Sequence, residues 1–129
     1  MINLYIDQRR SADITILDLK GRLRVGGNTI ALHRSINTLL AEKKRLIVLN
    51  LAGVSFIDSS GLGELIASQI SVENKGGSLK LAELTDSLKE LLSVTRLLNV
   101  FDVYDREADA IKSLEGALLE VANAPLAFA

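Results

Sequence analysis

Residues 46–63 read LIVLNLAGVSFIDSSGLG. The near-continuous apolar run over 46–51 is typical of a strand that is covered on both faces, as in a parallel or mixed sheet. A short loop follows this strand, and a helix is predicted to begin at about Ser59. A buried strand that leads into a helix predicts a layered α/β domain with an open sheet.

The start of this helix carries the most informative chemistry of the chain. Asp58 can accept hydrogen bonds from the first free amides, which puts Ser59 and Ser60 at the positive end of the helix with their hydroxyls near solvent. The carboxyl end of a strand is a common ligand site in open α/β sheets, and a phosphate group would be favoured there. The same three residues also fit a simple helix cap in which several side chains can serve as the capping group.

The flanking segments alternate between strand and helix patterns. Strands are predicted over 2–9, 14–20, 46–51, 78–84 and 100–104. Helices are predicted from Asn28 or Thr29 to about Lys43, from Ser59 to Gly76-Gly77, over a short segment begun by a Ser87–Glu90 capping box, and from Glu107 to about Val121. Gly21 is expected to end the second strand, and Gly76-Gly77 to stop the second helix and supply a left-handed cap.

Apolar residues at helical spacing predict which side of each helix faces the core. In chain order, the predicted buried stripes are Leu32, Ile36, Leu39 and Leu40; Leu62, Leu65, Ile66 and Ile70; Leu88, Leu91 and Leu92; and Ile111, Leu114 and Leu118.

The composition excludes several functional classes. The chain has 129 residues, which fit one domain expected over 1–121 with a weakly specified tail over 122–129. It contains no cysteine and one histidine, His33, so thiolate zinc sites, cysteine nucleophiles and multi-histidine metal sites are excluded. A net charge of −1 argues against general nucleic-acid binding. We expect no signal peptide, no membrane span and no cofactor, and therefore an intracellular protein with little equipment for catalysis.

The segment Val48–Ala67, VLNLAGVSFIDSSGLGELIA, resembles the core motif of the STAS domain, and in particular that of the bacterial anti-sigma factor antagonists. The stretch Leu91–Asp105 has the family's spacing before and through the last strand. The resemblance covers about Asn3 to Leu114. It implies an open mixed β-sheet of about five strands with four helices, in the order β-β-α-β-α-β-α-β-α.

The resemblance also implies a non-enzymatic, cytoplasmic partner switch that regulates transcription. The unphosphorylated protein would bind an anti-sigma factor that is itself a serine kinase, with ATP and magnesium on the kinase. Phosphorylation of Ser59 would end this binding, and a phosphatase of the PP2C type would reset the serine. The residues that match the motif around the switch, and are therefore expected on the partner surface, are Asp58, Ser60, Gly61, Leu62 and Gly63.

Two positions depart from the family pattern. Where the family commonly has Gly-x-Leu-Asp, this chain has Gly21-Arg22-Leu23-Arg24, so Arg24 carries the opposite charge close to the expected switch. Arg24 therefore predicts a different partner preference. Arg96 stands where glycine is usual, and is expected to affect only the turn before Leu97.

Two other functions remain open. A STAS domain can act as a constitutive interaction or scaffold module of a signalling complex or a lipid-transport assembly, without turnover at Ser59. A nucleotide-binding domain or enzyme could use the same helix start. His33 is expected at the surface or at the boundary of the core, with no neighbour to make it a base. Lys43-Lys44-Arg45 is expected to be a solvated helix end.

Overall fold

The computed structural model describes residues 4–24 and 26–123, and the side chains of 27, 28 and 117–123 lie outside the description. Within these residues the elements follow the predicted order, so the predicted fold class is confirmed. They are β1 (Leu4–Ser11), β2 (Ile14–Leu23), α1 (Gly27–Ala41), β3 (Leu46–Ile57), α2 (Ser59–Asn74), β4 (Ser78–Ala82), α3 (Asp86–Val94), β5 (Asp102–Tyr104) and α4 (Glu107–Asn123).

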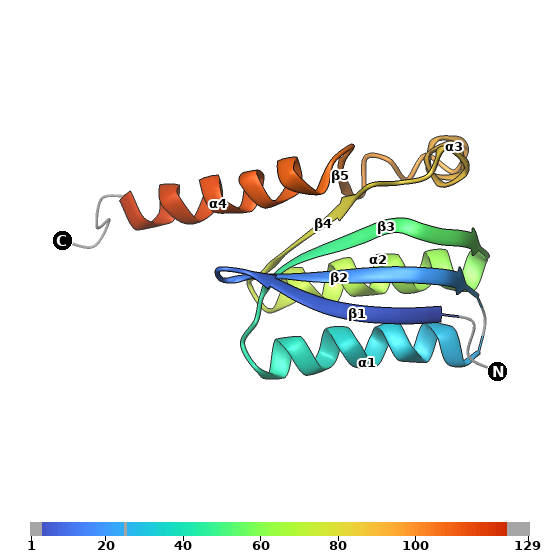
Figure 1. Ribbon diagram of the computed structural model, residues 1–129, viewed down its shortest axis with the longest axis horizontal. Coiled ribbons are helices and arrows are strands. Elements are labelled where there is room, and N and C mark those ends of the chain that lie inside the picture. The colour runs from blue at the N-terminus through green and yellow to red at the C-terminus, as the bar shows by residue number, and fades with distance from the viewer. Residues whose placement is uncertain (1–3, 25, 124–129) are drawn as a thin grey trace.

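The five described strands form one mixed sheet in the order β1-β2-β3-β4-β5. β1 and β2 form an antiparallel hairpin, and the later pairs are parallel. The last paired residues of β2 and β3 are Leu23 and Ile57, whereas β4 stops at Ala82 opposite Asn50. β2 and β3 therefore extend beyond the rest of the sheet, and the segment directly before Ser59 lies at this projecting end (Figure 1).

Helices cover both faces of the sheet. α1 and α2 lie on one face over the main core, while α4 lies on the other (Figure 1). β3 serves both cores, because Ile47, Leu49 and Leu51 face the first and Val48 packs with Leu114 of α4 in the second. The run over 46–51 is thus a doubly covered strand, as its sequence predicts.

A polar network ties α4 to the hairpin. The Arg9 guanidinium donates to Asp18 Oδ1 at 2.7 Å and also pairs with the carboxylate of Glu107, the first residue of α4. Asn50 Nδ2 donates to Glu107 Oε1 at 3.0 Å, and the Glu107 amide donates to Glu83 Oε2 at 2.6 Å. The hydrogen bond from Arg9 is the main cause that lowers the pKa of the Glu107 carboxyl.

Several strand bounds differ from the prediction: β1 ends at Ser11, β4 ends at Ala82, β5 begins at Asp102, and the largest differences are at the ends of β2 and β3. β2 continues through Gly21 to Leu23, and β3 continues past residue 51 to Ile57. The pairing register shifts between Asp18 and Lys20 and again after Gly21, and such bulges let a ladder continue past an irregular residue. Gly21 adopts a φ of 111°, which favours glycine, and the register shifts directly after it, at the position where the strand was expected to end.

Two helix starts also differ. α1 begins after Gly26, and the Thr29 hydroxyl donates to the Gly26 carbonyl at 3.0 Å, so the expected cap at Asn28 or Thr29 is wrong. α3 begins at Asp86, where the Thr85 hydroxyl accepts from the Leu88 amide at 3.2 Å. The Ser87–Glu90 capping box is therefore wrong, because a threonine two residues earlier already caps the helix.

Most of the predicted core residues are buried or pack against the core, but Ile70 is 52% exposed. The buried face of α2 contains Leu65 and Val72, and Ile70 lies roughly 140° around the helix from Leu65. Val100 precedes β5 and is also exposed. Ile2, the side chain of Leu118 and the tail from 124 lie outside the described residues, and α4 itself runs to Asn123.

Candidate functional site

Asp58 joins the end of the sheet to the start of α2. Its amide donates to the Leu23 carbonyl at 3.2 Å, and its Oδ1 accepts from the Gly61 amide at 2.8 Å. Its carbonyl accepts from the Leu62 amide at 2.9 Å, which begins the helical pattern. The predicted cap is confirmed, and the backbone immediately before Ser59 is fixed from both sides.

Ser59 and Ser60 are both exposed on the first turn of α2. Since Asp58 already satisfies the Gly61 amide, the amides of these two serines remain outside the helical hydrogen-bond pattern. The first turn of α2 contains no acidic residue. A free amide pair at the positive end of a helix favours an added anion, so a phosphate on either hydroxyl would be tolerated locally.

Gly61 allows α2 to approach the end of β2. A Cβ at this position would lie 2.2 Å from the Leu23 carbonyl oxygen and 2.9 Å from Ile57 Cγ1. Gly61 is buried, so its structural role is to position the serines. Gly63, by contrast, is exposed and has open space around it, and Leu62 packs partly against the core.

Arg24 follows Leu23 directly, and Leu23 is the residue whose carbonyl binds the Asp58 amide. The half-buried Arg24 therefore lies at the same end of the sheet as Ser59, as parallel pairing of β2 with β3 requires. Arg22, two residues earlier, is paired in register with Phe56. Arg22, Arg24 and Phe56 thus lie at the same end of the sheet as the start of α2.

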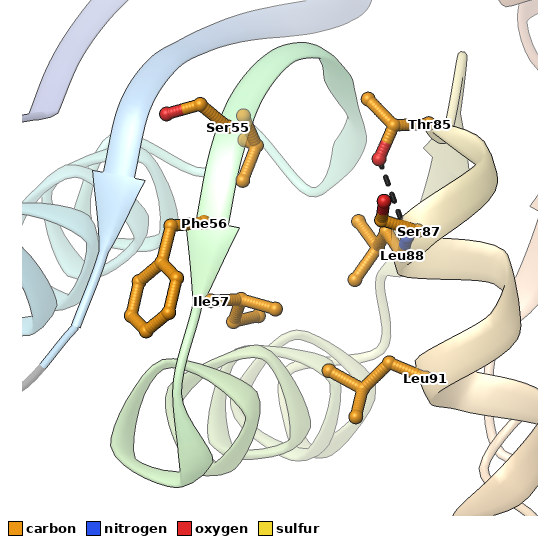
Figure 2. A pocket seen from close by; sticks show the side chains of 8 residues that line it. Ser55, Phe56, Ile57, Thr85, Ser87, Leu88 and Leu91 are labelled. Carbon is orange, nitrogen blue, oxygen red and sulfur yellow. Dashed lines mark hydrogen bonds between the residues drawn. The ribbon is translucent and has the colours of Figure 1, made fainter.

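A groove of about 270 Å³ lies next to this helix start, between the end of β3 and α3 (Figure 2). Ile57 and Leu88 face into it, while Phe56 points to the other side of β3 (Figure 2). Phe56 is 49% exposed. Sequence reasoning missed this groove and Phe56, because both depend on the extension of β3 beyond residue 51 and on the placement of α3.

His33 is exposed, as expected, but it has a neighbour that the sequence did not reveal. Its Nδ1 lies 3.2 Å from Glu64 Oε1, and its Nε2 lies 2.9 Å from Asn37 Nδ2. The expectation of an isolated histidine is therefore wrong, because α1 and α2 pack side by side and bring Glu64 across. Among the described residues, no cluster of three or more acidic or histidine side chains could hold a metal ion.

This geometry places an exposed serine pair on the capped N-terminus of a helix at the carboxyl end of a mixed sheet. The family model for the STAS domain matches residues 5–110, and the chain belongs to this family. The resemblance noted in the sequence is therefore confirmed, and so is the prediction of a non-enzymatic protein.

Within the family, the chain is similar to anti-sigma factor antagonists. It is 26% identical over 114 residues to the anti-sigma F factor antagonist of Paenibacillus polymyxa, with 88% of this chain and 97% of the relative covered. It is 28% identical over 102 residues to the anti-sigma-B factor antagonist of Bacillus subtilis strain 168, with 79% and 92% covered.

A solved structure shares the fold. The Bacillus cell fate determinant SpoIIAA in its phosphorylated form superposes with a TM-score of 0.66 at 19% identity, with 85% of this chain and 99% of that chain covered. Within the part of the chain that the structure describes, no helix has the length and apolar character needed to cross a membrane.

Proposed function

We propose that this protein is a cytoplasmic anti-sigma factor antagonist that works by partner switching. Its unphosphorylated form binds an anti-sigma factor, and phosphorylation of Ser59 ends the binding. The observation that carries this proposal is the exposed Ser59 hydroxyl on a helix start that Asp58 fixes to the sheet. Support comes from the two antagonist relatives, which align over most of their length.

The phosphoryl group would come from ATP held with magnesium on the partner. The Ser59 Oγ attacks the γ-phosphorus, ADP leaves, and the hydroxyl proton passes to a base on the kinase. A PP2C-type phosphatase would hydrolyse the phosphoserine with water and release inorganic phosphate. Ser59 is favoured over Ser60 as the acceptor because it directly follows the Asp58 cap, as in the family motif.

The partner surface would combine the exposed first turn of α2 with its surroundings. Ser60 and Gly63 are exposed, and Leu62 is partly exposed beside them. Gly61 contributes indirectly, because it sets the position of the helix start. The exposed ring of Phe56 and the groove beside Ile57 offer apolar contacts that a partner over Ser59 can reach.

Phosphorylation would act on the interface and leave the fold intact. The phosphate adds a charge of about −1.5 to −2 near neutral pH, and the free amides of Ser59 and Ser60 favour it locally. A partner docked over the same turn would have to desolvate this charge. An affinity loss of about 2–4 kcal/mol corresponds to a roughly 30- to 1000-fold weaker complex.

The departure at Arg24 favours an acidic partner or a stabilised phosphoserine. A guanidinium beside the switch can offer two parallel hydrogen bonds to a carboxylate or a phosphate. The family's usual aspartate would instead repel the phosphate. Arg24 would therefore prolong the phosphorylated state and slow its resetting.

The deciding experiment isolates the anti-sigma factor from the native cell with this protein as bait. The purified pair is then incubated with ATP, and the site is found by tandem mass spectrometry. One phosphate on Ser59, its loss in Ser59→Ala and its retention in the matched control Ser60→Ala would support the proposal. A phosphate on Ser60, or equal affinity of the two states in calorimetry, would contradict it.

Arg24 also gives a second candidate some weight, a STAS module that binds its partner constitutively. Because the charge at this position is reversed relative to the family pattern, a kinase whose surface is complementary to an aspartate would bind with lower affinity. A partner that captures wild type and Ser59→Asp equally, without any phosphate transfer, would favour this constitutive module.

A further inference from the structure

β3 has an open edge beyond the point where β4 ends. The pairing of β3 with β4 stops at Asn50 and Ala82, whereas β3 itself continues to Ile57. Residues 51–57 therefore pair with a strand on the β2 side only, over about 20 Å at the usual rise of a strand. Within the described residues, no backbone hydrogen bond joins this segment to α3 or to residues 83–85. The open edge faces the groove between β3 and α3 (Figure 2).

The last residue of β3 directs its backbone polar groups toward this groove. The Asp58 amide donates to the Leu23 carbonyl of β2 at 3.2 Å, and Asp58 is itself extended. Because successive residues of a strand direct their N–H and C=O groups to opposite edges, those of Ile57 point away from β2. Ile57 pairs with Leu23 directly after the pair of Phe56 and Arg22, so the strand is regular here although bulges precede it. A regular edge whose N–H and C=O groups face a groove can pair with a further strand.

The sequence of this edge does not protect it from pairing. Native sheets usually block an open edge with a charged side chain, with a proline or with an element that covers it. Residues 51–57, LAGVSFI, contain no charged residue and no proline. α3 lies beside this edge, but a groove of about 270 Å³ separates the two. The edge is therefore accessible to a strand from another molecule.

The side chains around the edge determine which kind of strand fits. The lining of the groove contains no charged residue and consists of Val54, Ser55, Phe56, Ile57, Thr85, Ser87, Leu88 and Leu91. A charged residue of a ligand would lose its water here without meeting a charge of opposite sign. An added strand would instead place alternate side chains against the apolar groups of Ile57, Leu88 and Leu91, and the others toward solvent. The lining therefore selects an uncharged segment in which apolar residues alternate with polar ones.

We propose that the groove between β3 and α3 binds an extended, uncharged segment of the partner, which adds to β3 as a further strand of the sheet. For the identity of the partner this inference rests on the proposed function, so that the anti-sigma factor supplies the segment. Main-chain hydrogen bonds to the open edge provide affinity, and contacts of alternate side chains with the groove provide specificity. The interface then includes backbone pairing in addition to the surface of α2.

The added strand would lie close to the proposed switch. Ile57 is two residues before Ser59, and Asp58 between them fixes the start of α2. A phosphate on Ser59 would therefore lie near the end of the added strand, and it would have to lose water against an uncharged segment. Phosphorylation and strand addition would thus oppose each other, which gives a physical reason for the loss of the partner.

The test titrates the full chain, isotope-labelled for NMR, with the uncharged pentapeptide acetyl-Thr-Val-Thr-Val-Thr-amide. The peptide should bind with a Kd of about 1 mM or lower, and the Ile57 amide proton should move downfield as it gains a hydrogen bond. A control peptide with the same side chains and methylated backbone amides should not bind, because it cannot pair with the edge. Equal binding of both peptides would overturn the proposal, and so would an Ile57 amide that is unchanged at about 5 mM peptide.

Two identical substitutions on α3 separate the groove from the rest of the helix surface. Ser87 and Ser93 are both exposed, but only Ser87 lines the groove. Ser87→Trp should fill the groove and weaken peptide binding by about tenfold or more, while Ser93→Trp should leave it unchanged. Both variants should melt close to wild type, because each replaces an exposed side chain. Equal weakening by the two variants, or unchanged binding in Ser87→Trp, would refute the groove as the binding site.

The titration requires neither a kinase nor a phosphate, so its outcome is distinct from that of the switch experiment. Peptide binding at the Ile57 edge, together with a failure to phosphorylate Ser59, would support strand addition and refute only the switch. Phosphorylation of Ser59 without any peptide binding would support the switch and refute strand addition.

Discussion

Replacing Gly61 with alanine should disturb the start of α2 more than any other single-methyl change there. The added Cβ would lie 2.2 Å from the Leu23 carbonyl oxygen. That oxygen already accepts the Asp58 amide, so it cannot move away without loosening the cap before Ser59. The variant therefore tests the contact that couples β2 to the proposed switch.

The expected magnitude follows from two opposing effects. Alanine is favoured over glycine in a helix interior by about 1 kcal/mol. An extra methyl group forced into a well-packed site typically costs about 1–3 kcal/mol, and contact with backbone oxygen places Gly61 at the upper end. We expect Gly61→Ala to lower the free energy of unfolding by about 2 kcal/mol.

Gly63→Ala is the matched control, two residues further along the same helix. A Cβ at Gly63 meets nothing within 4 Å, so only helix propensity acts and the variant should be more stable by about 1 kcal/mol. Urea unfolding followed by circular dichroism measures both variants beside wild type, and similar m-values would show that the compared states are equivalent. Equal stabilities of the two alanine variants would refute the role assigned to the Leu23 contact.

Three further predictions concern charged residues. Arg24→Asp should change the free energy of unfolding by only about 0–1 kcal/mol. It should still alter kinase affinity or phosphatase turnover several-fold. Values equal to those of wild type in both measurements would show that Arg24 has no role in the switch. Because Arg9 lowers the pKa of Glu107 below its ordinary value of 4.5, the folded state gains stability above that pH and loses it as the pH falls through the lower value. Glu107→Gln should therefore be about 1 kcal/mol less stable at neutral pH. Its free energy of unfolding, measured by urea titration between about pH 3 and pH 6, should fall less steeply with falling pH than that of wild type. An equal fall in the two proteins would contradict this. Arg96→Gly should stabilise the fold by about 1 kcal/mol in the same assay, and a loss of stability would show that the left-handed turn after α3 is not strained.

The sequence predicts those parts of the fold that depend on neighbours along the chain. The run over 46–51 indicates a doubly covered strand because alternate residues on both of its sides are apolar. The cap at Asp58 is recognisable because capping involves only the next three residues. The end of α2 at Gly76-Gly77 is recognisable for the same reason, because a helix end of this kind depends on one residue in the left-handed conformation, which Gly76 adopts.

The parts that the sequence does not predict depend on contacts between distant segments. The extension of β3 to Ile57 rests on bulged pairing with β2, and the exposure of Phe56 follows from it. The contact of Gly61 with Leu23 joins residues far apart in the chain. Ile70 fits a helical stripe by spacing, yet the buried face is set by packing against the sheet and includes the polar residues Ser68 and Gln69 instead.

The strand order β1-β2-β3-β4-β5 means that each strand pairs with the one that precedes it in the sequence. No strand has to wait for a distant segment, so the average loop that must close during folding is short, and short loops favour rapid folding. As the chain leaves the ribosome, the hairpin of β1 and β2 can form first, and every later strand can add to the edge that the previous one has left. The segment around Ser59 then takes up its position as soon as β3 joins β2, before α4 has been synthesised.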